Sequence, residues 1–192
     1  GIFSQSLVFG SAFTGIGKAQ AVWLWDGERR MVHLSVAGTD GAPLDPNGAL
    51  YRNLLAAIDS ARPPHQPLRV SPCHDLRFGL TAGLWVAPDY EAEKVLAAAG
   101  RALESAFGFA ARAFGQPVTG SEVLTALQGV AGVIGADLDR LVQVEAGLTV
   151  RTSSGPDGSI PARTARWQDS KLQPADLLLL DSAAVTLTER TS

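Results

Sequence analysis

A regular alternation of apolar with other residues between positions 76 and 86 is the feature that most constrains the fold of this 192-residue chain. Because successive side chains of a β-strand point to opposite faces, the alternation predicts a long strand with one buried face. A shorter alternation at Leu68 and Val70 predicts a short strand before it. The apolar members of the long strand are Leu76, Phe78, Leu80, Ala82, Leu84 and Val86.

The N-terminal third also has strand character. Residues 20–25 and 31–37 are apolar, aromatic and β-branched, and Asp26-Gly27 between them is a turn dipeptide, so we expect a β-hairpin. Leucine and isoleucine then recur at helical spacing and predict a helix over 49–61, which Pro63-Pro64 should end because proline disfavours a continuing helix.

Two further helices have identifiable starts. The first is expected over about 90–107, with Asp89 as the N-cap. The second is expected over 120–129, because Thr119 and Glu122 have the spacing of a capping box. Its apolar flanks are placed to form a hydrophobic staple, and they are Val118 and Val123.

The last third reads as strands and a loop. Strands are expected within 133–150, an exposed excursion over 151–170, and two short strands at 177–180 and 185–187. We expect Gly155 in the excursion to tolerate a side chain, unlike Gly115, for which a positive φ or close packing is expected. The candidate core residues of 133–150 are Leu138, Leu141, Val142, Val144, Leu148 and Val150.

The order of these elements predicts an α+β fold. Small mixed sheets would carry helices on one face in a split βαβ (ferredoxin-like) arrangement, with an N-terminal hairpin and short C-terminal strands added. We divide the chain into an N-terminal β segment at 1–30, a core at 31–150, and an exposed loop with C-terminal strands at 151–192. The opening Gly1-Ile2-Phe3 lacks Met, which favours a trimmed piece of a longer protein, with an N-terminal region missing.

Composition narrows the function classes. Hydrophobic residues make up 46% and charged residues 18%, as is typical of a globular chain rather than a disordered one. The net charge of -3, without a run of Lys or Arg, argues against a nucleic-acid partner. No apolar run reaches the roughly 18–20 residues of a membrane span.

Motifs for catalysis are weak. Gly15-Ile16-Gly17-Lys18 lacks the remaining residues of a phosphate loop or dinucleotide fingerprint, and we interpret it as a flexible connection between strands. Cys73-His74-Asp75 is the alternative that stays open, as the cleft of a small α+β enzyme or ligand-binding domain. Adjacent residues of a strand diverge, however, so a turn between two strands is the simpler interpretation. Neither His-x-x-His nor Cys-x-x-Cys spacing occurs, so we expect no metal site and no catalytic residue.

A second group of segments carries a family resemblance. Val86-Ala87-Pro88-Asp89-Tyr90 precedes a helix of about 17 residues, and the helix is followed by the run from Phe107 to Val118 and then Ser121-Glu122-Val123 and Gly129 to Val133. In this order they resemble the C-terminal part of baseplate J-like proteins, which are wedge components of contractile phage tails and related injection systems. The ending Pro174 to Asp181 with Val185 to Glu189 is also similar. The structural motif residues are Pro88, Asp89, Phe109, Arg112, Phe114, Gly115, Gln116, Pro117 and Gly132.

The resemblance implies a structural subunit without enzymatic activity or cofactor, acting in baseplate assembly and in triggering sheath contraction. It implies assembly in the bacterial cytoplasm into a phage tail or tail-like particle, of six-fold symmetry. The implied partners are other wedge and hub proteins, with a second copy of the chain as a further candidate. For the interface we single out Arg163, Arg166 and Trp167, because Arg and Trp are typical interface anchors, with Trp23 and Trp25 as an alternative contact.

Overall fold

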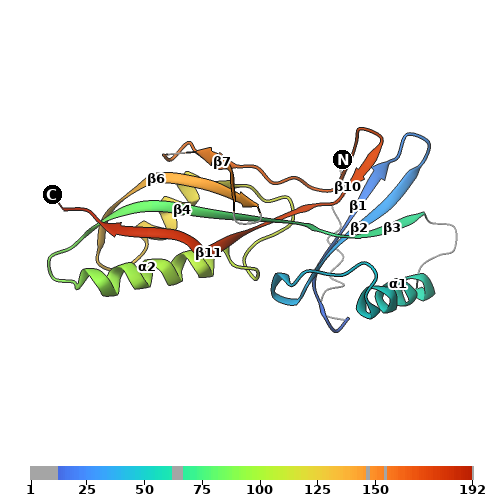
Figure 1. Ribbon diagram of the computed structural model, residues 1–192, viewed down its shortest axis with the longest axis horizontal. Coiled ribbons are helices and arrows are strands. Elements are labelled where there is room, and N and C mark those ends of the chain that lie inside the picture. The colour runs from blue at the N-terminus through green and yellow to red at the C-terminus, as the bar shows by residue number, and fades with distance from the viewer. Residues whose placement is uncertain (1–12, 62–66, 146–147, 154, 192) are drawn as a thin grey trace. The chain divides into compact units, whose positions relative to one another are not determined.

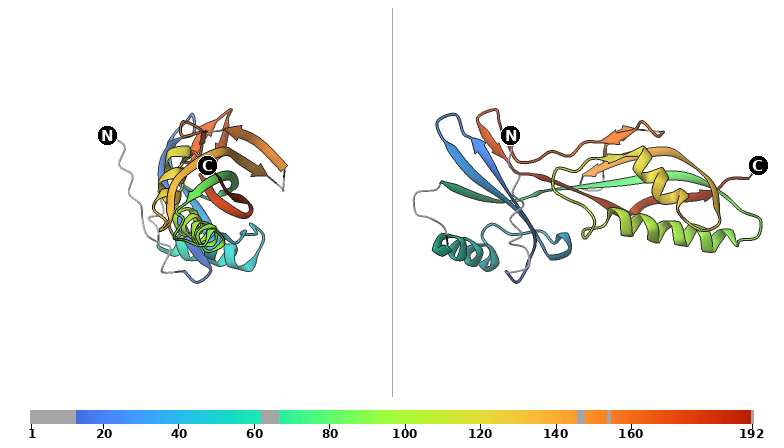
Figure 2. Two further views of the ribbon diagram at one scale, coloured as in Figure 1. Left: turned by 90° about the vertical axis from the view of Figure 1, so that its left-hand side faces the viewer. Right: turned by 180° about the vertical axis from the view of Figure 1, so that it is seen from behind.

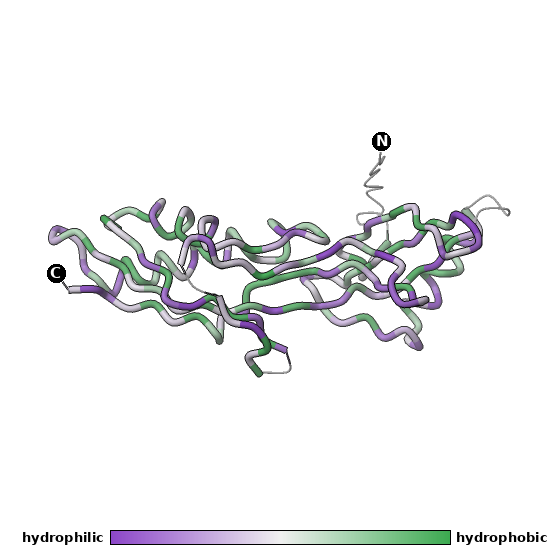
Figure 3. The backbone as a smooth tube through the Cα atoms, turned by 90° about the horizontal axis from the view of Figure 1, so that it is seen from above, coloured by the Kyte–Doolittle hydropathy of each residue, from purple (hydrophilic) through white to green (hydrophobic). Residues whose placement is uncertain are grey.

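The computed structural model describes residues 13–61, 67–145, 148–153 and 155–191, and the chain divides into two compact units (Figure 1). The first unit holds the residues up to Asp75 together with Arg163–Asp176, and the second holds Leu76–Ala162 and Leu177 onward. This division differs from the sequence-based boundaries at 30/31 and 150/151, because the chain returns to its first unit late in the sequence. Hydrophobic residues recur along the strands of both units (Figure 3).

A three-stranded sheet forms the centre of the first unit. Strand β1 (Ile16–Trp25) pairs antiparallel with β2 (Arg30–Gly38), which pairs parallel with β3 (Leu68–Pro72). The predicted hairpin is therefore confirmed. Its turn is held by Asp26, whose carboxylate accepts the backbone N–H groups of Glu28 and Arg29 at 3.0 and 2.8 Å.

One face of this sheet is covered by helix α1 (Ala49–Ala61), which has the predicted bounds and follows the short 3-10 helix η1 (Thr39–Gly41). Pro63-Pro64, expected to end α1, lies outside the described residues. Helix α1 connects the neighbouring parallel strands β2 and β3, so the three elements make a βαβ unit. The buried apolar residues of this layer are Ile16, Leu34, Val36, Tyr51 and Leu54.

A segment from the last third of the chain completes the first unit. Strands β9 (Arg166–Gln168) and β10 (Lys171–Gln173) pair antiparallel in a hairpin that the sequence did not predict. The backbone N–H of Ala175 donates to the Ser35 hydroxyl at 2.9 Å and so joins this segment to β2. Leu34 and Val36 lie on the face of β2 that packs with α1. The opposite face of β2 is also buried, at Met31, His33 and Ser35.

The second unit is built on a four-stranded sheet in the order β11-β4-β6-β7. Strand β6 (Val133–Glu145) pairs antiparallel with both β4 (His74–Val86) and β7 (Leu148–Ser153), and β11 (Asp176–Glu189) forms the other edge. The long alternating strand is confirmed. Its predicted apolar face is buried from Leu76 to Leu84, while Val86 is only partly covered.

Helices α2 (Ala92–Phe107) and α3 (Gly120–Gln128) pack on that apolar face (Figure 2). Phe107 of α2 meets Phe78 of β4 edge to face, with ring centroids 5.4 Å apart. The buried residues of α2 are Val95, Ala99, Leu103 and Phe107. The expected α+β class with small mixed sheets is thus confirmed.

Three local expectations are corrected. Asp89 is not the N-cap of α2, because the chain makes a turn from Ala87 to Tyr90 and the helix starts only at Ala92, with Glu91 at the cap position. The two short C-terminal strands are one strand, β11, in the main sheet. Leu148 and Val150 are exposed rather than in the core, because β7 is an edge strand.

The predicted exposed excursion is also only partly exposed. Strand β5 (Val118–Thr119) pairs with β8 (Ser159–Ile160), and Ile160 is fully buried. Gly120 at the start of α3 donates its N–H to Gly158 at 2.7 Å, and a Cβ there would lie only 2.1 Å from the carbonyl oxygen of Gly155. A glycine is therefore required where this segment approaches the helix.

Candidate functional site

The connection from α2 to α3 is organised by the buried Arg112. Its Nη2 donates to the carbonyl oxygens of Gln116 and Pro117 at 2.9 and 2.6 Å, and its guanidinium carbon lies 5.5 Å from the centre of the Phe107 ring. Burial lowers the pKa of Arg112 below its usual value, and the negative charge of Glu122 partly opposes that shift. The charged side chain therefore stabilises the chain segment that contains Gln116 and Pro117.

Three further residues of the connection between α2 and α3 have defined structural positions. Phe114 is buried, the Gln116 side chain accepts the N–H of Ala113 at 3.0 Å, and Gly115 has a φ of 69°. Gly155 also has a φ of 69°, so the backbone at Gly155 favours glycine as well, although no atom within 4 Å would contact a Cβ there. The expected contrast between the two glycines therefore cannot rest on φ.

The start of α3 has the predicted cap. The Thr119 hydroxyl accepts the Glu122 N–H at 3.2 Å, and the Glu122 carboxylate accepts the Thr119 N–H at 2.9 Å. This reciprocal pair confirms the capping box. Val118 and Val123, the two residues of the predicted staple, are both fully buried in the core.

The remaining motif residues lie at the two ends of α2. Pro88 and Asp89 are exposed in the turn before the helix, and Phe109 is half-buried after it. Gly132 has a φ of 91°, its carbonyl oxygen accepts the Ala87 N–H at 2.8 Å, and a Cβ on it would lie 2.7 Å from the Tyr90 ring. These residues set the path of the chain around α2.

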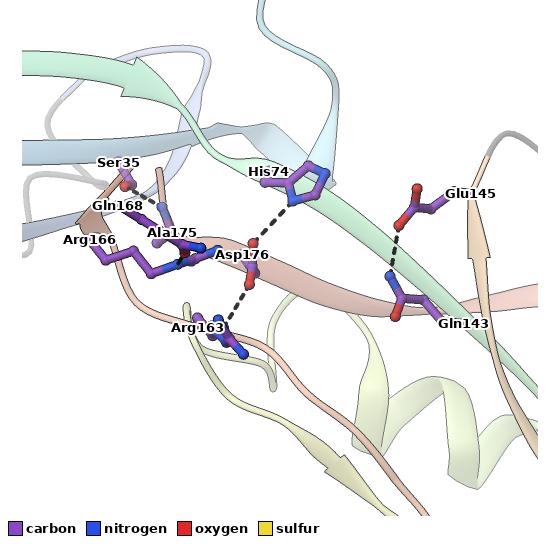
Figure 4. A network of polar contacts seen from close by, with 9 residues as sticks. All are labelled: Ser35, His74, Gln143, Glu145, Arg163, Arg166, Gln168, Ala175 and Asp176. Carbon is purple, nitrogen blue, oxygen red and sulfur yellow. Dashed lines mark hydrogen bonds and ion pairs between the residues drawn. The ribbon is translucent and has the colours of Figure 1, made fainter. Parts of the chain in front are cut away.

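A polar network in the first unit holds the segment Arg163–Asp176, here called the returning segment, in place (Figure 4). The carboxylate of Asp176 accepts from the His74 imidazole Nδ1 at 3.1 Å and from the backbone N–H of Arg163 at 2.7 Å. Asp176 is buried, while the side chain of His74 is 58% exposed. The backbone N–H of His74 also donates to Ala175 at 2.9 Å, so both ends of the segment Arg163–Asp176 are tied to the start of β4.

The network continues into a fully buried histidine. His33 lies between the hydroxyls of Ser71 on β3 and Ser35 on its own strand, at 3.2 Å from Nε2 and 3.4 Å from Nδ1. Because the Ser35 hydroxyl accepts the Ala175 N–H, it can donate its proton to Nδ1, which leaves Nε2–H to donate to Ser71. Burial, and to a lesser extent the charge of Arg69, lowers the pKa of His33 to about 4, so the imidazole is neutral at pH 7.

In the Cys73-His74-Asp75 run, Cys73 and His74 make hydrogen bonds that hold chain segments together. The Cys73 N–H donates to the Val36 carbonyl oxygen at 2.8 Å, and the His74 imidazole is bound to Asp176 rather than aimed at the neighbouring thiol. Gly15-Ile16-Gly17-Lys18 enters β1 directly, with an irregular register between Ile16 and Lys18, so it is the start of a strand and not a connection. Among the described residues, no group of three or more His, Cys, Asp or Glu is placed to hold a metal ion.

The expected interface residues are placed on the returning segment. Arg163 is exposed, and Arg166 and Trp167 on β9 are half-buried, with the Arg166 Nε 3.1 Å from the Gln168 side chain. The alternative contact, Trp23 and Trp25, is 57% and 59% exposed on one face of β1. Sequence reasoning missed Asp176, Ser35 and His33, whose partners lie far away in the chain.

Comparison with known proteins locates one family in this chain. Residues 8–71 match the family model described as the baseplate J-like central domain, a third of the 192 residues. The match takes in β1, β2, α1 and most of β3, and it ends before the motif residues at 88–132, whose likeness to the family it does not test. No curated protein matches the chain. No helix in the described parts has the length and hydropathy to cross a membrane. The match of this segment supports the resemblance of the chain to baseplate J-like proteins.

Proposed function

We propose that this chain is a wedge component of the baseplate of a contractile tail or contractile injection system, acting through protein–protein contacts. The observation that carries the proposal is the match of residues 8–71 to the baseplate J-like central domain. That family is structural, and the charged and polar side chains described above are used in internal contacts that fix chain segments. The proposal includes wedge and hub proteins as partners, a six-fold assembly formed in the bacterial cytoplasm, and a role in triggering sheath contraction.

The returning segment supports this proposal as a contact surface. Asp176 holds its ends through Arg163 and His74, so the β9–β10 hairpin is presented on a fixed base rather than on a free loop. The Trp167 side chain is only half-covered, and Arg and Trp are enriched at the energetic centres of interfaces. We therefore retain Arg163, Arg166 and Trp167 as the proposed interface.

The test is incorporation into particles. Cells lacking the chain should form no sheathed particles in electron micrographs, and the wild-type chain should restore them. The double variant Arg163→Ala and Trp167→Ala should be poorly incorporated, while the exposed Arg101→Ala on α2 serves as the matched surface control. Complete, contracting particles in cells that lack the chain would refute the proposed function.

A further inference from the structure

The edge strand β7 is the most exposed strand of the second unit. It ends the sheet order β11-β4-β6-β7, and within the described residues it pairs only with β6. Leu148 is 71% and Val150 is 52% exposed, and the residues from 148 to 152 are all exposed. Natural sheets usually protect such an edge with charges or proline, since its unpaired backbone groups can pair with another strand. An apolar, uncovered edge is therefore a template for strand addition.

A groove of about 350 Å³ adjoins this edge in the same unit. It includes Thr81 of β4, whose side chain alternates with the residues that pack on α2 and α3, so the groove opens on the other face of the sheet. Both edge strands contribute to it, with Thr149 from β7 and Ala184 from β11. The side chains at these positions are small, which leaves room for the side chains of an extended segment lying along β7.

The charges indicate the chemistry of that segment. Arg140 lines the groove and Arg151 lies on β7, and both are exposed without a hydrogen-bond or ion-pair partner among the described residues. The carboxylate in the groove, Asp181, accepts the N–H of Ala183 at 3.1 Å. Two free guanidinium groups at an apolar edge favour acidic side chains between apolar ones.

We propose that β7 and the adjoining groove bind an extended acidic segment of a neighbouring baseplate subunit, which adds a strand to this sheet. This inference rests on the proposed function for the existence of the particle. Backbone pairing with β7 supplies the affinity, and alternate side chains of the bound segment contact Leu148, Val150 and the groove. The irregular register between Gln143 and Val144 leaves Val150 without a cross-strand partner, so its side chain is available.

The test compares two pairs of variants in assembled particles. Leu148→Asp with Val150→Asp removes the apolar side chains and places negative charges on the edge, and Arg140→Glu with Arg151→Glu reverses the charge of the two free guanidinium groups. Ile134→Asp is the matched control, since Ile134 is 70% exposed in the same unit but lies outside the edge and the groove. All five changed side chains are exposed, so circular dichroism and thermal melting of the free chain should be unchanged.

Each double variant should lower incorporation into particles by about tenfold or more, equivalent to about 1.4 kcal/mol, while the control should incorporate normally. A photo-crosslinking residue at position 150 should join the chain to an acidic segment of a different subunit, identified by mass spectrometry. Normal incorporation of both double variants, or crosslinks only to a second copy of this chain, would overturn the inference. If wild-type chain enters no particle at all, it is the proposed function that fails.

Discussion

Because His33 is buried and neutral, the free energy of unfolding of the first unit should fall as the pH is lowered. The pKa of His33 is about 4 in the folded chain against 6.5 for the free side chain. The unfolded chain therefore binds a proton as the pH falls through 6.5, while the folded chain resists protonation until about 4. Stability contributed by the neutral imidazole is present above pH 6.5 and is lost progressively between 6.5 and 4.

The magnitude follows from the same two values. The full difference of about 2.5 pKa units corresponds to about 3 kcal/mol, of which about 2 kcal/mol should be lost between pH 7 and pH 4.5. Carboxylates titrate over the same range, so the measurement needs a chain that lacks only this imidazole. His33→Gln keeps a polar side chain between Ser71 and Ser35 but cannot titrate.

Urea unfolding at pH 7 and pH 4.5 for both chains isolates the effect. The wild type should lose about 2 kcal/mol more than His33→Gln on acidification. Nuclear magnetic resonance of the imidazole protons gives an independent value, with the His33 resonance assigned by its absence in the variant. Equal losses in the two chains, together with a His33 titration midpoint near 6.5, would refute the assignment of a desolvated neutral histidine.

Four substitutions test the second unit by thermal and urea unfolding. Arg112→Met should cost about 2–4 kcal/mol, because two carbonyl groups lose their charged donor; a change under about 1 kcal/mol would contradict its role as an internal brace. Gly132→Ala should cost about 2 kcal/mol or more and Gly155→Ala about 1, since both have positive φ but only Gly132 lacks room for a Cβ; equal costs would contradict this. Thr119→Ala should cost about 1 kcal/mol through the loss of the capping box, and an unchanged melting temperature would argue against that cap.

Elements with local signals were predicted well. Helix α1 has the predicted bounds, because leucine spacing marks its apolar face. The start of α3 was predicted because Thr119 and Glu122 satisfy each other over three residues. The start of α2 was missed by about two residues, since the Pro88-Asp89 pair resembles a capped start but belongs to a separate turn.

Elements defined by distant partners were not predicted. Strand β11 was expected as two short strands because Asp181 and Ser182 interrupt its apolar run, yet an edge strand can carry polar side chains where one side is open to solvent. The network around Asp176 was missed because its partner His74 is 102 residues away. Cys73-His74-Asp75 is a cluster only along the sequence, whereas His74 interacts with Asp176, which no local pattern could indicate.

The buried face of β2 explains why the family match and the first unit have different extents. The match ends at residue 71, close to Asp75, where the continuous part of the first unit ends. Ser35 on this face is fully buried, and its hydroxyl is bound by Ala175, which follows 140 residues later. A buried hydroxyl without that donor would lose a hydrogen bond in a place where water does not replace it readily. The contiguous segment that matches the baseplate J-like central domain is therefore only part of a compact unit, to which the segment Arg163–Asp176 also belongs.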